Sequence, residues 1–193
     1  SSDLKIAFVH CAGSKEKAVK AYEYKGVQDC VAASLLQGGP KGCQYGCMGF
    51  GTCVKNCPFG AMTMGENGLP IIDEKKCTGC GVCKSVCPKK VIDLVPPGIH
   101  VAINCKSNDK GAVARKLCTI ACIGCGICVK NCLHGAIKVE NNLAVVDSKI
   151  CMSECNETTC TAKCPTGAIK AFIKEAPAAS IAAKPVENKT LAD

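Results

Sequence analysis

Short apolar runs recur along the chain, and they lie next to its Cys residues. Four of them continue from a Cys, in CPFGAMTM (57–64), CPKKVIDLV (87–95), CLHGAIKV (132–139) and CPTGAIKAF (164–172). Two others, LPIIDEKKC (69–77) and LAVVDSKIC (143–151), match each other and lead into a Cys-rich loop. Such runs favour short strands. Each unit is therefore predicted as strand, Cys loop, short helix and strand. No apolar run approaches the roughly eighteen residues of a membrane span, so a soluble fragment is expected.

The composition is rich in thiols and poor in large apolar side chains. The 193 residues include 20 Cys but no Trp, three Tyr and four Phe. Cys residues in tight groups indicate metal ligation in a reducing compartment rather than a disulfide framework. The first residues, SSDLKIAFVHC, show no signal-peptide pattern. Metal binding would then supply stability that the small core lacks.

The charge balance depends on what the thiols bind. The formal net charge is +8 with every Cys counted as neutral. An oxidised [4Fe–4S] cluster with four thiolates contributes roughly −2, so four clusters would bring the holo-protein near zero. The chain also lacks the interleaved aromatic residues that stack on bases. No nucleic-acid partner is expected.

Sixteen Cys form four groups of related spacing. The second and third groups follow C-x2-C-x2-C-x3-C, and the first and fourth are wider. In order, the groups are Cys43, Cys47, Cys53 and Cys57; Cys77, Cys80, Cys83 and Cys87; Cys122, Cys125, Cys128 and Cys132; Cys151, Cys155, Cys160 and Cys164. In two-cluster bacterial ferredoxins this spacing sends the fourth Cys to the other cluster. Structural zinc favours two separated CxxC pairs and fits poorly.

The sequence thus predicts an α+β fold of two tandem two-cluster, 2[4Fe–4S], ferredoxin-like domains. The first spans residues 1–96 with an N-terminal strand and helix extension, the second 97–174, and a disordered tail follows at 175–193. The segment VPPGIH (95–100) is the expected hinge. With crossed ligation, the four predicted [4Fe–4S] ligand sets are Cys43, Cys47, Cys53 and Cys87; Cys57, Cys77, Cys80 and Cys83; Cys122, Cys125, Cys128 and Cys164; and Cys132, Cys151, Cys155 and Cys160.

Four Cys lie outside these sets, namely Cys11, Cys30, Cys105 and Cys118. Three interpretations are open: buried thiols that pack as small hydrophobic side chains, a close thiol pair in each domain, or a fifth metal centre formed across both domains. Leu133 stands where the other three groups have Pro. This is interpreted as drift, or else as tuning of the nearby cluster.

Longer stretches resemble one family. YEYKGVQDC (22–30), GGPKGCQYGCMGFGTCVKNCPFGAM (38–62), CKSNDKGAVARKLCTIACIGCGICVKNC (105–132) and NNLAVVD (141–147) are similar to the B subunit of Rnf complexes, over roughly residues 4–173. Those complexes are membrane-bound, ion-pumping ferredoxin:NAD oxidoreductases. The resemblance implies a subunit at the cytoplasmic face of the membrane that takes electrons from reduced ferredoxin and passes them to the other subunits. The family's N-terminal membrane helix and the cluster domain after it are missing here, so the soluble polyferredoxin part is expected.

The expected function is transfer of single electrons through four [4Fe–4S] clusters within such a complex, without a catalytic substrate site in this chain. The alternative is a free-standing polyferredoxin, or a ferredoxin-like subunit of a soluble oxidoreductase or hydrogenase. Basic residues near Cys11 and Cys105, including Lys106, Lys110 and Lys116, could attract an acidic electron donor.

Overall fold

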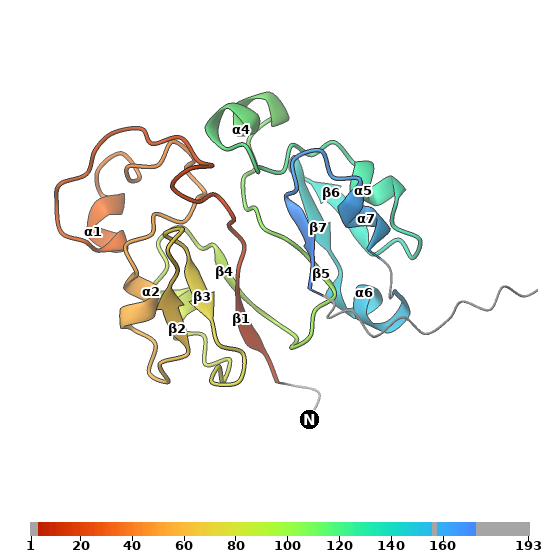
Figure 1. Cartoon of the computed structure of the whole chain (residues 1–193), viewed down its shortest axis with the longest axis horizontal. Helices are drawn as coiled ribbons and strands as arrows, with labels where there is room; N and C mark the ends of the chain where they lie inside the picture. The colour runs from red at the N-terminus through yellow and green to blue at the C-terminus, as the bar shows by residue number, and fades with distance from the viewer. Residues whose placement is uncertain (1–3, 156–157, 173–193) are drawn as a thin grey trace, which may run out of the picture.

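The structure is a computed structural model that describes residues 4–155 and 158–172. The tail predicted to be disordered, 175–193, lies outside the described residues. We refer to residues 4–96 as the first half and to the described residues from 97 onward as the second half. Figure 1 shows the two halves side by side, with helix α4 at the top between them.

The first half contains two antiparallel strand pairs and three short helices. In chain order its elements are β1 (Ile6–Val9), α1 (Cys30–Ser34), α2 (Thr52–Lys55), β2 (Met62–Met64), β3 (Pro70–Ile72), α3 (Val82–Ser85) and β4 (Ile92–Val95). Strand β1 pairs with β4, and β2 pairs with β3. The outer strand pair therefore joins the two ends of this half, while the inner pair is a hairpin between its Cys loops.

The second half repeats this arrangement. Its elements are β5 (Val101–Ile103), α4 (Gly111–Leu117), α5 (Ile127–Lys130), β6 (Ile137–Glu140), β7 (Leu143–Val146), α6 (Ser148–Glu154), α7 (Thr159–Ala162) and β8 (Ile169–Ala171). Strand β5 pairs with β8 and β6 with β7, all antiparallel. The prediction of a mixed fold with short strands and short helices is confirmed.

Glycine opens three of the short helices next to the Cys loops. Gly51, Gly81 and Gly126 precede α2, α3 and α5 with φ of 75°, 81° and 72°. Residues with a Cβ rarely adopt this left-handed conformation. The glycines therefore let a Cys loop turn sharply into a helix whose second residue is itself a Cys.

Each half has a small core in which thiols pack beside aliphatic side chains. In the first half Val91 and Ile92 are fully buried with Cys47, Cys53 and Cys83. The core of the second half likewise combines aliphatic residues with four buried Cys. Because the sulfur atoms face these cores, whatever they bind lies inside each half rather than on its surface.

The two halves are joined by contacts that are distant in sequence. Ala12 N–H donates to Asn104 O at 3.1 Å, and Val19 N–H donates to Leu117 O at 2.8 Å. Ala18 packs with the residues that follow α4. The segment after Cys11 therefore lies against the second half. Within the described residues, no helix is long and apolar enough to cross a bilayer.

The segment predicted as a hinge, 95–100, has contacts of its own. Ile99 is buried. His100 O accepts a hydrogen bond from Phe172 N–H at 2.8 Å, and His100 Nδ1 lies 2.7 Å from Cys155 O. Through these contacts, Ile99 and His100 are attached to the end of β8 and to the fourth Cys group.

Candidate metal centres

In the second half, two sets of four thiols come together. Burial first, and then the neighbouring Cys122, Cys125 and Cys164, raise the pKa of Cys128 to about 11. Mutual influence of this kind requires four sulfur atoms close to one another. Cys122, Cys125 and Cys128 belong to the third Cys group, whereas Cys164 ends the fourth. The set therefore crosses between groups.

The other set in this half crosses in the opposite direction. Burial and then Cys132, Cys151 and Cys155 raise the pKa of Cys160 to about 11. Cys132 ends the third group and the other three Cys begin the fourth. Both sets contain the residues predicted for them from the motif spacing.

In the first half, one cavity collects the second predicted set. Cys77, Cys80 and Cys83 line it together with Cys57, which ends the first group. Helix α3 carries Cys83, and Ala7 in β1 donates its N–H to Cys77 Sγ at 3.4 Å. The crossed pattern is thus repeated in this half.

The remaining set differs from the one predicted. Its cavity is lined by Cys47, Cys53, Cys87 and Cys30. Burial and then Cys30 and Cys87 raise the pKa of Cys53 to about 11. Cys43, expected in this set, does not line the cavity. It lines a separate cavity, with Cys11, Cys105 and Cys118. The structure thus brings Cys30 to the position that sequence spacing assigned to Cys43.

Hydrogen bonds hold Cys30 in this place. Its N–H donates to the buried Thr52 Oγ1 at 2.7 Å, and the Thr52 hydroxyl donates to Asp29 Oδ2 at 2.7 Å. Asp29 also accepts from Val31 N–H at 2.8 Å and so caps α1. Thr52 begins α2 and directly precedes Cys53. The start of α1 is thereby fixed against the start of α2.

A signal for this exchange was present in the sequence. CMGFGTCVKNC (47–57) aligns without gaps with CIGCGICVKNC (122–132), so that Phe50 occupies the position of Cys125. The first group is then not a widened motif but a regular one with its second thiol replaced, and Cys30 lines the cavity beside the remaining thiols. Phe50 instead packs against Tyr24, with ring centroids 5.3 Å apart.

Backbone N–H groups point at several of the sulfur atoms. Ala144 N–H donates to Cys122 Sγ at 3.4 Å, and Ala136 N–H donates to Cys132 Sγ at 3.2 Å. Such bonds stabilise negative charge on sulfur and are one of the means by which a protein adjusts an iron–sulfur potential. The thiol sets therefore combine four neighbouring sulfur atoms with backbone N–H donors to some of them, and four Cys sulfur atoms are the donor set that iron–sulfur clusters require.

The turn after each group's final Cys is the same in all four groups. The N–H of Gly60, Lys90, Gly135 and Gly167 donates to the carbonyl oxygen of the Cys three residues earlier, at 3.1–3.4 Å. All four donors have positive φ. Leu133, at the position where the other groups have Pro, is 69% exposed. Its replacement of Pro leaves the turn unchanged.

Within the described residues, no group of three or more His, Cys, Asp or Glu side chains is arranged to hold a single metal ion. His10, His100 and His134 each have an oxygen partner rather than a sulfur atom. His10 and His100 lie against carbonyl oxygens, and His134 lies 3.6 Å from Glu154.

Comparison with known proteins places part of the chain in a described family. Residues 42–91 match the model of the 4Fe-4S dicluster domain. The chain is 63% identical over 169 residues to the B subunit of the proton-translocating ferredoxin:NAD(+) oxidoreductase complex of Clostridium ljungdahlii, covering 88% of this chain and 59% of that protein.

Two more distant relatives agree. The B subunit of the Na(+)-translocating ferredoxin:NAD(+) oxidoreductase complex of Acetobacterium woodii is 48% identical, over 90% of this chain and 51% of that protein. The B subunit of the ion-translocating oxidoreductase complex of Methanosarcina acetivorans is 41% identical, over 88% of this chain and 63% of that protein. The chain thus spans between about half and two thirds of the length of these relatives, and in that part it belongs to the family of the B subunits of Rnf-type ferredoxin:NAD oxidoreductase complexes.

Proposed function

We propose that this chain relays single electrons through [4Fe–4S] clusters held by its crossed thiol sets, as part of an Rnf-type ferredoxin:NAD oxidoreductase. Residues 1–96 and 97–174 form two tandem two-cluster ferredoxin-like domains in this proposal. The observation that carries it is the crossing itself. In each of the four sets, the fourth thiol is the last Cys of the other Cys group in the same half, which is the arrangement of two-cluster ferredoxins.

Four ligand sets are proposed. They are Cys30, Cys47, Cys53 and Cys87 (set 1); Cys57, Cys77, Cys80 and Cys83 (set 2); Cys122, Cys125, Cys128 and Cys164 (set 3); and Cys132, Cys151, Cys155 and Cys160 (set 4). Set 1 contains Cys30 in place of the Cys43 expected from spacing.

A [4Fe–4S] cluster supplies a one-electron redox couple when it is bound. The chain's own residues determine where that couple lies and what surrounds it. The crossed Cys ligands keep the two sites of each half adjacent. Buried thiols such as Cys47 and Cys160 exclude water from one side of each site, and the N–H groups of residues such as Ala7 and Ala144 stabilise the thiolate charge.

Two sites lie nearest to solvent. Cys80 in set 2 and Cys125 in set 3 are exposed, whereas most other ligands are buried or half-buried. An external redox partner can approach these two sets most closely. Sets 2 and 3 are therefore the proposed points at which electrons arrive from one partner and leave for another.

In this proposal the donor is reduced ferredoxin and the acceptors are other subunits of the complex, at the cytoplasmic face of the membrane. The names of the relatives support this assignment, since they state a ferredoxin:NAD(+) oxidoreductase complex and a B subunit. They favour it over a free-standing polyferredoxin.

The test is iron and acid-labile sulfide analysis of the anaerobically reconstituted chain, combined with EPR during stepwise reduction. The proposal predicts at least about sixteen iron atoms per chain and reduced-cluster EPR signals. A colourless protein that binds zinc instead would contradict it.

A further inference from the structure

Four thiols outside the four proposed sets line one cavity at the junction between the two halves. Cys11, Cys43, Cys105 and Cys118 surround about 360 Å³ of empty space, part of it open to solvent. Gly13 leaves this space open. A Cβ on Gly13 would lie 3.2 Å from Cys118 Sγ and 3.8 Å from Cys11 Sγ. The cavity therefore exists because this position has no side chain.

The four thiols are related in pairs by the repeat. Cys11 follows β1 and Cys105 follows β5, each two residues after the strand ends. Cys43 lies four residues before Cys47, as Cys118 lies four residues before Cys122. Each half thus contributes two equivalent thiols to the cavity. Small buried thiols that merely fill space would not need this correspondence.

The sulfur atoms in the cavity have the same kind of hydrogen bonds as those of the four sets. Cys47 N–H donates to Cys11 Sγ at 3.3 Å, and Ser107 N–H lies 3.5 Å from Cys105 Sγ. Cys11, Cys43, Cys105 and Cys118 line the same cavity, and backbone N–H groups point at two of their sulfur atoms.

A positive charge is placed beside the cavity. The half-buried Lys41 donates from Nζ to Gly13 O at 2.5 Å and to Cys47 O at 2.6 Å. Lys41 and Lys106 both line the cavity. A cluster with four thiolates is an anion of roughly −2. Lys41 would offset part of that charge, whereas Lys106 is paired with Asp93.

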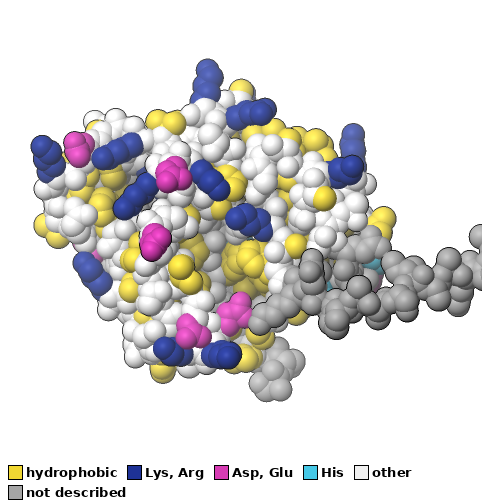
Figure 2. Space-filling model, in the orientation of Figure 1, with side chains coloured by type: hydrophobic (Ala, Val, Ile, Leu, Met, Phe, Trp, Pro, Cys, Tyr) yellow, Lys and Arg dark blue, Asp and Glu magenta, His cyan; other side chains and the backbone are white. Residues whose placement is uncertain are grey.

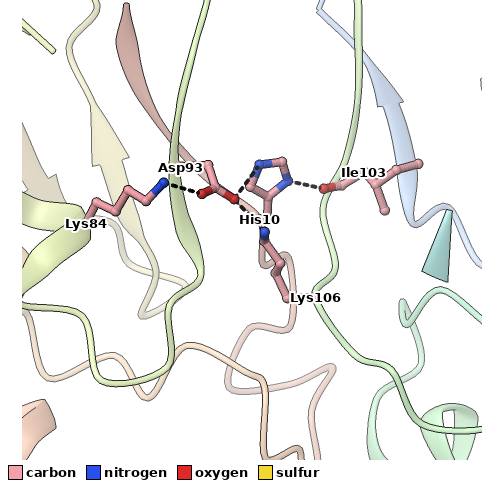
Figure 3. Close-up of polar contacts among 5 residues, drawn as sticks. All are labelled: His10, Lys84, Asp93, Ile103 and Lys106. Carbon is pink, nitrogen blue, oxygen red and sulfur yellow. Dashed lines mark hydrogen bonds and ion pairs between the residues drawn. The ribbon is translucent and has the colours of Figure 1, made fainter. Parts of the chain in front are cut away.

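Polar contacts across the junction fix the strands that carry these thiols. Figure 3 shows Asp93 between Lys84 and Lys106, with His10 beside it and reaching Ile103. Lys106 Nζ lies 2.5 Å from Asp93 Oδ2, and His10 Nδ1 lies 2.7 Å from Ile103 O. His10 precedes Cys11 and Lys106 follows Cys105. The thiols from the two halves are thus held in register with each other.

We propose that Cys11, Cys43, Cys105 and Cys118 ligate a fifth [4Fe–4S] cluster, which connects the two halves. Its role as a relay rests on the function proposed above. Cys11 accepts a hydrogen bond from Cys47 of set 1, and Cys105 lies beside Cys122 of set 3. The fifth site accepts one electron from the reduced site at set 1 or set 3, and that site is thereby oxidised. It then passes the electron to the other of these two sets.

The experiment is native mass spectrometry with iron and sulfide analysis on the anaerobically reconstituted full chain. The fifth site predicts about twenty iron atoms per chain instead of about sixteen. A mass that shows sixteen iron atoms and four clusters would overturn it while leaving the relay function intact. Far fewer than sixteen would overturn both. A mass that shows one metal ion at this site instead of four iron atoms would overturn the proposal of a cluster there.

Variants locate the additional iron. Cys118→Ala is expected to lose about four iron atoms, and Cys11→Ala/Cys118→Ala is expected to lose the same four rather than eight. Gly13→Val keeps all twenty thiols but fills the cavity, and it is expected to lose those four as well. Ala112→Val, which also ends in Val but adds its bulk at an exposed position of α4, is the control and should retain all iron. Unchanged iron in Cys118→Ala and Gly13→Val would overturn the assignment. The wild-type mass decides the count even if a variant fails to fold.

Discussion

Cys47 donates its backbone N–H to the sulfur atom of Cys11, at 3.3 Å. The first of these residues belongs to a proposed ligand set of the first half, and the second faces the cavity between the halves. The bond shows that the two sites are adjacent. It also means that the charge on one site acts on the other, so their reduction potentials should be coupled.

Double variants can separate the roles of Cys30 and Cys43. Cys30→Ala/Cys47→Ala should lose no more iron than Cys47→Ala alone, about four atoms, because both residues serve set 1. Cys43→Ala/Cys47→Ala should lose about eight, because these residues serve two sites. The measurement is iron and sulfide content after anaerobic reconstitution. A loss of about eight iron atoms in Cys30→Ala/Cys47→Ala and about four in Cys43→Ala/Cys47→Ala would instead assign Cys43 to set 1.

Leu133→Pro should be neutral or slightly stabilising. Leu133 is exposed, and the turn it begins matches the three turns in which Pro stands at this position. Pro at a compatible position reduces the entropy of the unfolded chain and contributes about 0.4–1 kcal/mol. We expect full iron content and a melting temperature equal to or slightly above that of the wild type. Loss of the cluster proposed at set 4, which contains Cys132, would show that Leu133 has a role of its own.

Asp93→Asn should weaken the junction between the halves in a pH-dependent manner. Burial opposes ionisation of Asp93, but hydrogen bonds and charge from Lys106 and Lys84 outweigh it and lower the pKa of this carboxyl group. A lowered pKa in the folded state stabilises the protein above the unfolded value of about 4, and this stability is lost as the pH falls through the folded value.

For a partly exposed group the contribution is at most about 1 kcal/mol, or about 2–4 °C for a chain of this size. Anaerobic melting temperatures of wild type and Asp93→Asn should differ by this amount at pH 7 and converge only as the pH falls below about 4. Glu140→Gln, which affects the exposed pair with Lys138, is the control and should change little. A difference that persists unchanged at low pH would contradict the ion-pair explanation.

The basic residues on α4 offer a place for an acidic donor. Lys110, Arg115 and Lys116 are exposed, and Figure 2 shows Lys and Arg side chains at the top of the molecule, where Figure 1 places α4. Lys106 was expected to take part, but it is paired with Asp93. Reversing the charge of Lys106 would disturb the junction between the halves, so Lys106 is left unchanged in this test.

Lys110→Glu/Lys116→Glu should slow reduction by an acidic ferredoxin several-fold at low ionic strength and much less at high salt, because steering is screened over about 10 Å at 0.1 M. The measurement is the stopped-flow rate at several salt concentrations. Lys138→Glu, on β6 of the second half, is the matched control. A rate and salt dependence equal to those of the wild type would place the docking surface elsewhere.

The sequence predicted much of this arrangement because ligand spacing is a local property. The gap of a few residues between Cys77, Cys80 and Cys83 forces these thiols to one side of a loop, and the repeat carries the same geometry into the second half. The same reasoning placed Cys43 with Cys47, because the two lie close together along the chain. In the structure, however, the side chain of Cys43 lines another cavity.

What the sequence could not predict depends on long-range contacts. Cys30 reaches its set only because Thr52 holds it. The cavity between the halves also depends on contacts between residues as distant as His10 and Ile103. Neither contact leaves a periodic pattern. The aligned position of Phe50 opposite Cys125 was the one local indication that a thiol had to come from outside the motif.

The most direct test of the crossed thiol sets is an iron anomalous difference map from anaerobically grown crystals of the reconstituted chain. We expect a compact four-iron peak in contact with Cys87 and the three other thiols of set 1, and corresponding crossed peaks at the other sets. Single-ion peaks, disulfides, or clusters ligated by the Cys of one group alone would contradict the account.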